Sequence, residues 1–167
     1  TIKNFGENKH HDQIFGDFTG DGQQELVSWN QGNSRLLLFE IPSDPRSSDR
    51  WNHTVIYRGN SKDEGLAKAD INQNGKTDII GAGKWFEHIE GNKFKKHVID
   101  AEMNFTRSAV GQLVEGGYPE VLFVPGDANG YAKWYEFKND QWNAHSLDSV
   151  THGHTVDIRD INQNGNM

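Results

Sequence analysis

The sequence of 167 residues has no cysteine, no basic cluster and no long hydrophobic run. Without cysteine there is neither a disulfide framework nor a thiol nucleophile. The formal net charge is −7, which argues against nucleic acid and anionic membranes as partners. No segment approaches the roughly 20 apolar residues of a transmembrane helix, so we expect no membrane span.

Glycine and aromatic residues are plentiful instead. The chain holds 18 glycines, nine phenylalanines, five tryptophans and four tyrosines, although only 34% of its residues are hydrophobic. Few patterns of helix length occur, and glycine-rich turns separate short apolar runs, which predicts short strands. A chain of 167 residues is long enough to form a hydrophobic core. The aromatic side chains supply large apolar surfaces for that core.

A nine-residue loop pattern recurs along the chain. In DINQNGKTD (70–78), oxygen-bearing side chains occupy positions 1, 3 and 5, a glycine occupies position 6 and a carboxylate occupies position 9. The same pattern begins at Asp17 and at Asp160. The 90 residues between Asp70 and Asp160 are about twice the expected repeat, and a degenerate copy fits at 111–123, where Gln112 replaces the first aspartate.

Other short sequences recur in phase with the loop. Each of the first three loops is followed by an apolar run, then by LFE (38–40), WFE (85–87) or WYE (134–136), and then by a segment at 51–56, 94–99 or 142–147. Each repeat therefore predicts four short strands, with the apolar run buried on both faces.

Units of four strands at a period near 50 residues are typical of propeller blades. We therefore predict an all-β fold made of β-propeller blades. The predicted blades lie at about 10–57, 63–100 and 106–148, with the start of another at 152–167. A blade cannot bury both faces alone, so we expect these three and a half blades to belong to a larger ring, whose remainder would be needed for closure.

The repeated loop predicts a cage for a hard cation. Ca²⁺ takes six to eight oxygen ligands, and alternate side chains of a tight turn, with one backbone carbonyl, can supply them. The predicted ligands are Asp17, Thr19, Asp21, Gln23 (carbonyl) and Glu25 in the first loop, Asp70, Asn72, Asn74, Lys76 (carbonyl) and Asp78 in the second, and Asp160, Asn162 and Asn164 in the last. The degenerate loop at Gln112 is not expected to bind an ion.

Two alternatives to this calcium loop were weighed. An EF-hand requires glutamate at position 12 followed by a helix, whereas Ser28 or Gly81 occupies that position here and a strand is predicted to follow. The second alternative is a metal-free turn, because asparagine, aspartate and glycine favour tight turns by themselves.

The motifs GDFTGDGQQEL (16–26) and ADINQNGKTDII (69–80) resemble the FG-GAP/VCBS repeats of integrin-like β-propellers, and the similarity covers essentially the whole chain. The resemblance implies a calcium-stabilised propeller, seven-bladed when complete, in a secreted, periplasmic or cell-surface protein. It leaves the function open, because this fold serves adhesins, lectins, polysaccharide lyases, glycosidases and sugar dehydratases.

The segments that lead into each first strand hold an unusual concentration of titratable groups. In a propeller these segments line the mouth of the channel on the face opposite the calcium loops. His11, Glu64, Thr106 and His154 occupy the same position, six residues before each loop begins. The candidate catalytic residues are His10, His11, His154 and Arg107, and the candidate substrate-binding residues are Asp12, Asp63, Glu64, His152, Trp29 and Tyr131.

Several kinds of chemistry are open to this rim. Histidine can act as a general acid or base near neutrality, and two histidines with carboxylates could hold an additional divalent metal such as zinc. Loop histidines that are merely solvated are the alternative. Trp29 and Tyr131 lie outside the repeated words and could stack on sugar rings, whereas the recurring Trp85 and Trp134 are better explained by packing between blades.

The leading hypothesis is a propeller that acts on carbohydrate. In a lyase or dehydratase, His11 or His154 would abstract a proton next to a carbonyl or carboxylate and Arg107 would stabilise the enolate. The alternatives are a non-catalytic lectin or adhesin that uses the same face, and a purely structural propeller.

Overall fold

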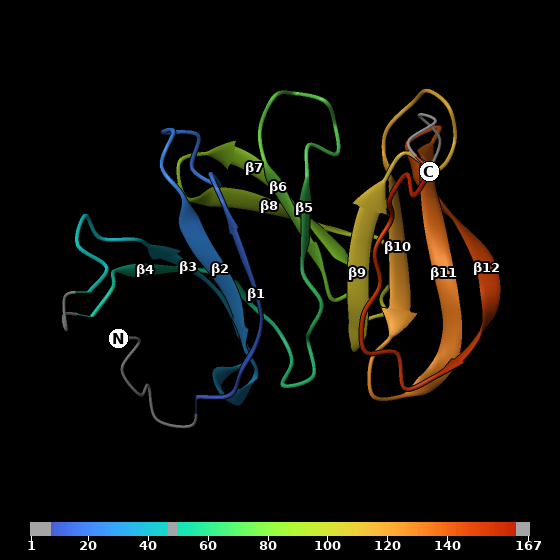
Figure 1. The fold of residues 1–167 in the computed structure, drawn as a ribbon, viewed down its shortest axis with the longest axis horizontal. Coiled ribbons are helices and arrows are strands. Elements are labelled where there is room, and N and C mark those ends of the chain that lie inside the picture. The colour runs from blue at the N-terminus through green and yellow to red at the C-terminus, as the bar shows by residue number, and fades with distance from the viewer. Residues whose placement is uncertain (1–7, 47–49, 163–167) are drawn as a thin grey trace.

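The structure is a computed structural model that describes residues 8–46 and 50–162. It consists of three antiparallel sheets of four strands each, in chain order, joined by turns (Figure 1). The first sheet contains β1 (His10–Gly16), β2 (Glu25–Asn30), β3 (Arg35–Glu40) and β4 (His53–Arg58), with one 3-10 turn, η1 (Gln31–Asn33). The second contains β5 (Ala67–Ala69), β6 (Asp78–Gly81), β7 (Lys84–Glu90) and β8 (Lys93–Val98), and the third contains β9 (Thr106–Gly111), β10 (Glu120–Pro125), β11 (Asn129–Lys138) and β12 (Gln141–Thr151).

The prediction of an all-β fold built from units of four strands is confirmed for these three sheets. The apolar runs form the second strand of each sheet, and every residue of β2, β6 and β10 is buried. Within the described residues the sheets do not close into a ring (Figure 1). The propeller and its number of blades therefore stay predictions.

The core lies between successive sheets. Trp29, Leu36 and Leu38 of the first sheet pack against Ile79 and Phe86 of the second. A separate cluster joins the second sheet to the third, and its buried members from those sheets are Ile80, Trp85, Val121, Phe123 and Tyr135. Aromatic edges contribute, because Trp29 and Phe86 meet at 6.2 Å in an edge-on arrangement that suits ring quadrupoles.

The first strands of the three sheets lie next to one another, since β5 contacts both β1 and β9 (Figure 1). The loops 17–24 and 70–77 lie at one end of these strands, at the top of Figure 1, and the segment 59–66 lies at the other. We call the first the loop end and the second the rim end. This arrangement separates the two sets of candidate residues.

The segment after β12 runs back alongside β9. The backbone carbonyl of His154 accepts a hydrogen bond from Arg107 Nε at 3.1 Å, and Val156 and Ile158 pack against Ala109 and Leu122. Residues 152–162 form no strand, and the start of a further blade at 152–167 stays a prediction. A strand needs a hydrogen-bonding neighbour, and no later strand of the described chain lies beside this segment.

Candidate functional site

The first loop gathers three carboxylates. Asp17, Asp21 and Glu25 each offer one oxygen, and these oxygens lie within 4.8 Å of one another. Asp17 accepts hydrogen bonds from the backbone N–H groups of Gly20 and Gly22, at 2.7 and 2.9 Å, which shapes the turn. Thr19 Oγ1 lies 3.3 Å from Glu25 Oε1 and donates to it, and Gln23 N donates to Asp21. The predicted side-chain ligands are thus brought together.

The second loop repeats this turn with Asn72 in place of Thr19 and Asn74 in place of Asp21. Asp70 accepts from the N–H groups of Asn74 and Gly75, as Asp17 does in the first loop. Asn72 Nδ2 donates to Glu87 Oε1 at 3.0 Å, while Asn72 Oδ1 is buried without a hydrogen-bond partner. A buried oxygen without a partner carries a desolvation cost. A cation in this loop would remove that cost.

The carboxylate at position 9 has the same backbone partner in three loops. Glu25, Asp78 and Glu120 accept hydrogen bonds from the N–H groups of Phe18, Ile71 and Leu113, respectively. Burial raises the pKa of Glu25 and of Asp78 above the ordinary value, even though these hydrogen bonds act in the opposite direction. Position 9 therefore closes the loop even where no ion is predicted.

The remaining loops differ from these two. Gln112 donates its amide N–H to the carbonyls of Val114 and Gly116, at 2.6 and 2.8 Å, so the amide itself holds the turn together. In the last loop Asp160 and Asn162 follow the segment beside β9, and Asn164 lies outside the described residues.

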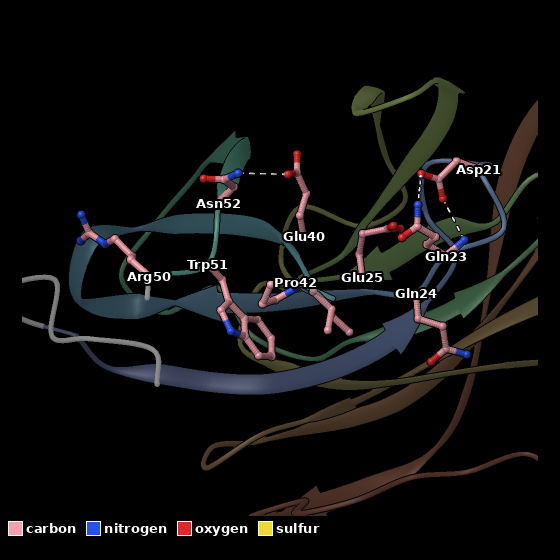
Figure 2. Close-up of a pocket in the computed structure, with 10 residues that line it drawn as sticks. Asp21, Gln23, Gln24, Glu25, Glu40, Pro42, Arg50, Trp51 and Asn52 are labelled. Atoms are coloured by element: carbon pink, nitrogen blue, oxygen red, sulfur yellow. Dashed lines mark hydrogen bonds between the residues drawn. The ribbon is translucent and has the colours of Figure 1, made fainter. Parts of the chain in front are cut away.

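A pocket of about 310 Å³ opens beside the first loop (Figure 2). Asp21, Gln23 and Glu25 form one wall, and Trp51, Pro42 and Ile41 supply apolar surface. Trp51 packs against the cluster of Leu26, Leu37 and Phe39, and it also lines this pocket. The pocket links the predicted calcium loop to the end of β3.

At the rim end, three sheets meet through one buried carboxylate. Glu64 is 1% exposed. Its Oε2 lies 3.3 Å from His11 Nδ1 and accepts a hydrogen bond from Gln31 Nε2 at 3.0 Å. Its Oε1 pairs with Arg107 Nη1. The repeat had aligned His11 and Glu64 with Thr106, the neighbour of Arg107, and the fold places both His11 and Arg107 in contact with Glu64.

Asp12 belongs to the same group of side chains. It lies at a bulge in β1, between His11 and Gln13, with a φ of 49°. Its Oδ2 accepts a hydrogen bond from Gly65 N at 2.8 Å, which connects the first sheet to the segment before β5. His11, Asp12 and Glu64 each offer one atom within 4.8 Å of the others.

Other predicted rim residues lie apart from this group. His10 Nδ1 forms a hydrogen bond with Ser28 Oγ at 3.0 Å, and the imidazole ring lies against Phe39. Burial lowers the pKa of His10. The side chain of His154 is 75% exposed and lies 3.4 Å from Asp127 Oδ1. His152 is exposed at the end of β12. These histidines do not share one centre with His11.

Two predicted contact residues need correction. Trp29 is 1% exposed, and its Nε1 donates to the carbonyl of Gly65 at 2.9 Å, so it belongs to the core. Asp63 is fully buried and lies 3.8 Å from Lys84 Nζ. A ligand at the surface would not reach either side chain, because packing between the first two sheets covers both.

Tyr131 remains accessible. Its side chain is 58% exposed and lines a pocket of about 420 Å³ between the second and third sheets. Phe105 and Pro125 add apolar surface, and Lys62 and Lys133 add positive charge. Lys133 also pairs with Asp100 at 3.2 Å.

Sequence reasoning missed Gln31, which is buried and holds Glu64, and Lys84, which pairs with Asp63. Gln31 does not recur in phase with the repeat, whereas Lys84 precedes WFE as Lys133 precedes WYE, so only Lys84 carried a signal in the pattern.

Comparisons with known proteins agree with the repeat. Residues 17–81 match the model of the family described as FG-GAP-like repeat. The comparison with curated proteins found no match, and neither did the comparison with solved structures. No helix among the described residues is long and apolar enough to cross a membrane. The matched segment contains both loops at Asp17 and Asp70, strands β2 to β4 of the first sheet and strands β5 and β6 of the second. The chain therefore carries an FG-GAP-like repeat at residues 17–81.

Proposed function

We propose that this chain is a Ca²⁺-binding, propeller-type module that binds carbohydrate at its rim end. The observation that carries the proposal is the donor set of the first loop, where oxygens of Asp17, Asp21 and Glu25 lie within 4.8 Å of one another. Oxygens on opposite sides of a Ca²⁺ ion lie about 4.6–5.2 Å apart, because each Ca–O distance is about 2.3–2.6 Å. These residues therefore fit around one ion.

The second loop supports the same assignment. Its residues are Asp70, Asn72, Asn74 and Asp78, with the carbonyl of Lys76, and the partnerless Asn72 Oδ1 is available to a cation. A bound ion would offset the charge of the loop carboxylates and tie the first strand of each sheet to the second. The loop at Gln112 fills this role with its own amide, so no ion is proposed there.

Carbohydrate binding is proposed for the pocket at Tyr131. An exposed aromatic ring beside a few polar groups is the usual arrangement for stacking on the apolar face of a sugar. Lys62, Lys133 and Glu102 line the same pocket and supply polar groups for the hydroxyl groups of a sugar. Because the chain carries an FG-GAP-like repeat, which resembles the repeats of integrin-like propellers, we place the protein in a secreted, periplasmic or cell-surface setting.

Binding is favoured over catalysis by the position of Arg107. The enzyme hypothesis needs Arg107 free to stabilise an enolate, but Arg107 pairs with buried Glu64 and its side chain is 14% exposed. A lectin-type or adhesin-type role requires only the structural ion pair of Arg107 with Glu64.

Thermal unfolding in excess Ca²⁺ and in excess EDTA tests the calcium part of the proposal. Ca²⁺ at 100 times its dissociation constant stabilises the folded state by about 2.7 kcal/mol per site. We therefore expect a higher Tm in Ca²⁺ than in EDTA, with Mg²⁺ giving a smaller shift. Equal Tm values in Ca²⁺ and EDTA would contradict the proposal.

Binding to immobilised acidic and neutral oligosaccharides tests the carbohydrate part. Tyr131→Ala is expected to lower affinity about 5–12-fold, which corresponds to the loss of one stacking contact worth about 1–1.5 kcal/mol. Tyr118→Ala is the matched control, because Tyr118 is 39% exposed and lies in the loop after β9, at the loop end. The carbohydrate assignment fails if both variants bind as the parent protein does.

A further inference from the structure

We propose that His11, Asp12 and Glu64 form a second kind of metal site, for a divalent transition ion such as Zn²⁺. His11, Asp12 and Glu64 each offer one ligand atom, and these atoms all lie within 4.8 Å of one another. The site lies at the rim end, away from the calcium loops. It goes beyond the proposed function, which requires no ion at this end.

The spacing of His11 and Glu64 differs from that of an ordinary ion pair. His11 Nδ1 and Glu64 Oε2 are 3.3 Å apart, whereas charge-assisted hydrogen bonds are about 2.7–2.9 Å long. In the same protein His97 and Glu87 lie 2.7 Å apart, whereas the exposed pair of His154 and Asp127 lies 3.4 Å apart. Two ligands at about 2.0–2.1 Å from a tetrahedral Zn²⁺ ion lie about 3.3 Å apart, which is the spacing found at Glu64.

The backbone of β1 aims both side chains at Glu64. Neighbouring residues of a regular strand point to opposite faces. If β1 were regular, His11 and Asp12 would therefore lie on opposite faces and could not share a site. The bulge between His11 and Gln13, with Asp12 at a φ of 49°, breaks this alternation. Bulges re-aim side chains in this way. Gly65 N holds Asp12 Oδ2, which leaves Asp12 Oδ1 for an ion.

A second layer of residues holds Glu64 in place. Arg107 pairs with Oε1, on the side away from His11, and Gln31, which is 4% exposed, donates to Oε2. Ligating carboxylates in metal sites are themselves hydrogen-bonded in this manner. Asp12, Glu64 and Arg107 together carry one net negative charge, so a dication is attracted to the site.

The donor set selects against Ca²⁺. Ca²⁺ takes six to eight oxygen ligands, whereas imidazole suits zinc and its first-row neighbours. Three protein ligands leave a tetrahedral ion one open position. The side chain of His11 is 35% exposed, so the site is open to solvent and the remaining position would take water or an oxygen donor of a ligand.

Isothermal titration of the chelator-treated protein with Zn²⁺ tests this site. Saturating Ca²⁺ is kept present so that the calcium loops do not contribute, and Co²⁺ absorption in the visible range reports the coordination geometry. We expect one equivalent of Zn²⁺ to bind and a tetrahedral Co²⁺ spectrum. Binding of no Zn²⁺ would overturn the proposal.

Variants separate this site from surface histidines. His11→Ala is expected to weaken Zn²⁺ binding by at least about 10–100-fold. Removing a residue that only hydrogen-bonds to a metal ligand already costs that much affinity. Asp12→Asn tolerates the left-handed backbone and still accepts from Gly65, yet loses the charge, so it should weaken binding too. His154→Ala, at an exposed histidine outside the group, should bind as the parent does. Equal losses in His11→Ala and His154→Ala, or no loss in Asp12→Asn, would overturn the proposal.

Discussion

Asp100 and Tyr135 meet between the second and third sheets. The Tyr135 hydroxyl donates to Asp100 Oδ2 at 2.7 Å, and Lys133 Nζ lies 3.2 Å from the same oxygen. Burial alone would raise the pKa of Asp100, but hydrogen bonds from Tyr135, Glu102 N and Lys133 outweigh it and hold the pKa below 3.8. Burial, with the nearby Asp100 carboxylate, raises the pKa of Tyr135.

Tyr135→Phe removes one hydrogen bond and little packing volume. A hydrogen bond to a charged group contributes about 1.5–3 kcal/mol, so we expect the free energy of unfolding at pH 7 to fall by about that amount. Because the folded-state pKa of Asp100 is lowered, the contribution of its ionised form is present above pH 3.8 and is lost as the pH falls through the folded-state value. Urea unfolding of both proteins between pH 7 and pH 3 should show the difference shrinking.

The exposed hydroxyl of Tyr131 provides the control for this prediction. Tyr131→Phe should leave the free energy of unfolding unchanged within about 0.5 kcal/mol, as surface substitutions usually do. A difference between Tyr135→Phe and the parent that stays constant with pH would show that Asp100 is not the partner that matters.

The role of a single residue was predicted well where that residue recurs in the sequence repeat and poorly where it does not. Trp85 recurs in the repeat, was assigned to packing, and is buried between sheets. Trp29 was assigned to a ligand because it falls outside the repeat, yet its indole lies in the core. Absence of recurrence does not distinguish a contact residue from a core residue, because burial depends on the neighbouring sheet.

At the scale of elements, one glycine sets how closely the second sheet approaches the third. Gly65 has a φ of +84°, and a Cβ there would lie 2.6 Å from the backbone oxygen of Thr106, the first residue of β9. Its N–H also holds Asp12. The glycine therefore lets the segment before β5 lie against both neighbouring sheets.

Gly65→Ala is expected to destabilise the protein through backbone strain and through a clash. A left-handed conformation costs a residue with a Cβ about 1–2 kcal/mol, and overpacking costs about 1–3 kcal/mol more. Gly117→Ala isolates the strain, because Gly117 has a φ of +74° and nothing lies within 4 Å of its added Cβ. Denaturant unfolding should show the larger loss for Gly65→Ala, and equal losses would rule out the close approach.

The strands could be predicted from the sequence because their signals are local. The apolar runs bounded by glycine turns form β2, β6 and β10. The motifs LFE, WFE and WYE that follow them lie in β3, β7 and β11. The segment 152–162 carries the inner-strand pattern without forming a strand. Pairing with a second strand, which is not a local property, decides whether such a segment joins a sheet.

At the scale of the whole molecule, the chain has two ends of different chemistry. Oxygen-bearing side chains gather in the loops at one end, and a histidine, two carboxylates and an arginine gather at the other. The repeat predicted both sets, because residues at one position of a repeat lie at one end of its strands. It did not predict which rim residues touch, since His11, Glu64 and Arg107 come from three sheets whose relative twist the sequence pattern does not contain.

Direct titration with Ca²⁺ of the parent protein and of two loop variants tests the central claim most directly. We predict that the double variant Asp17→Asn, Asp21→Asn binds one ion fewer than the parent, because the first loop loses two carboxylates of its donor set. Gln112→Ala should bind as many ions as the parent, since the amide of Gln112 holds its loop without metal. An unchanged number of ions in the double variant, or no Ca²⁺ binding by the parent protein, would contradict the account.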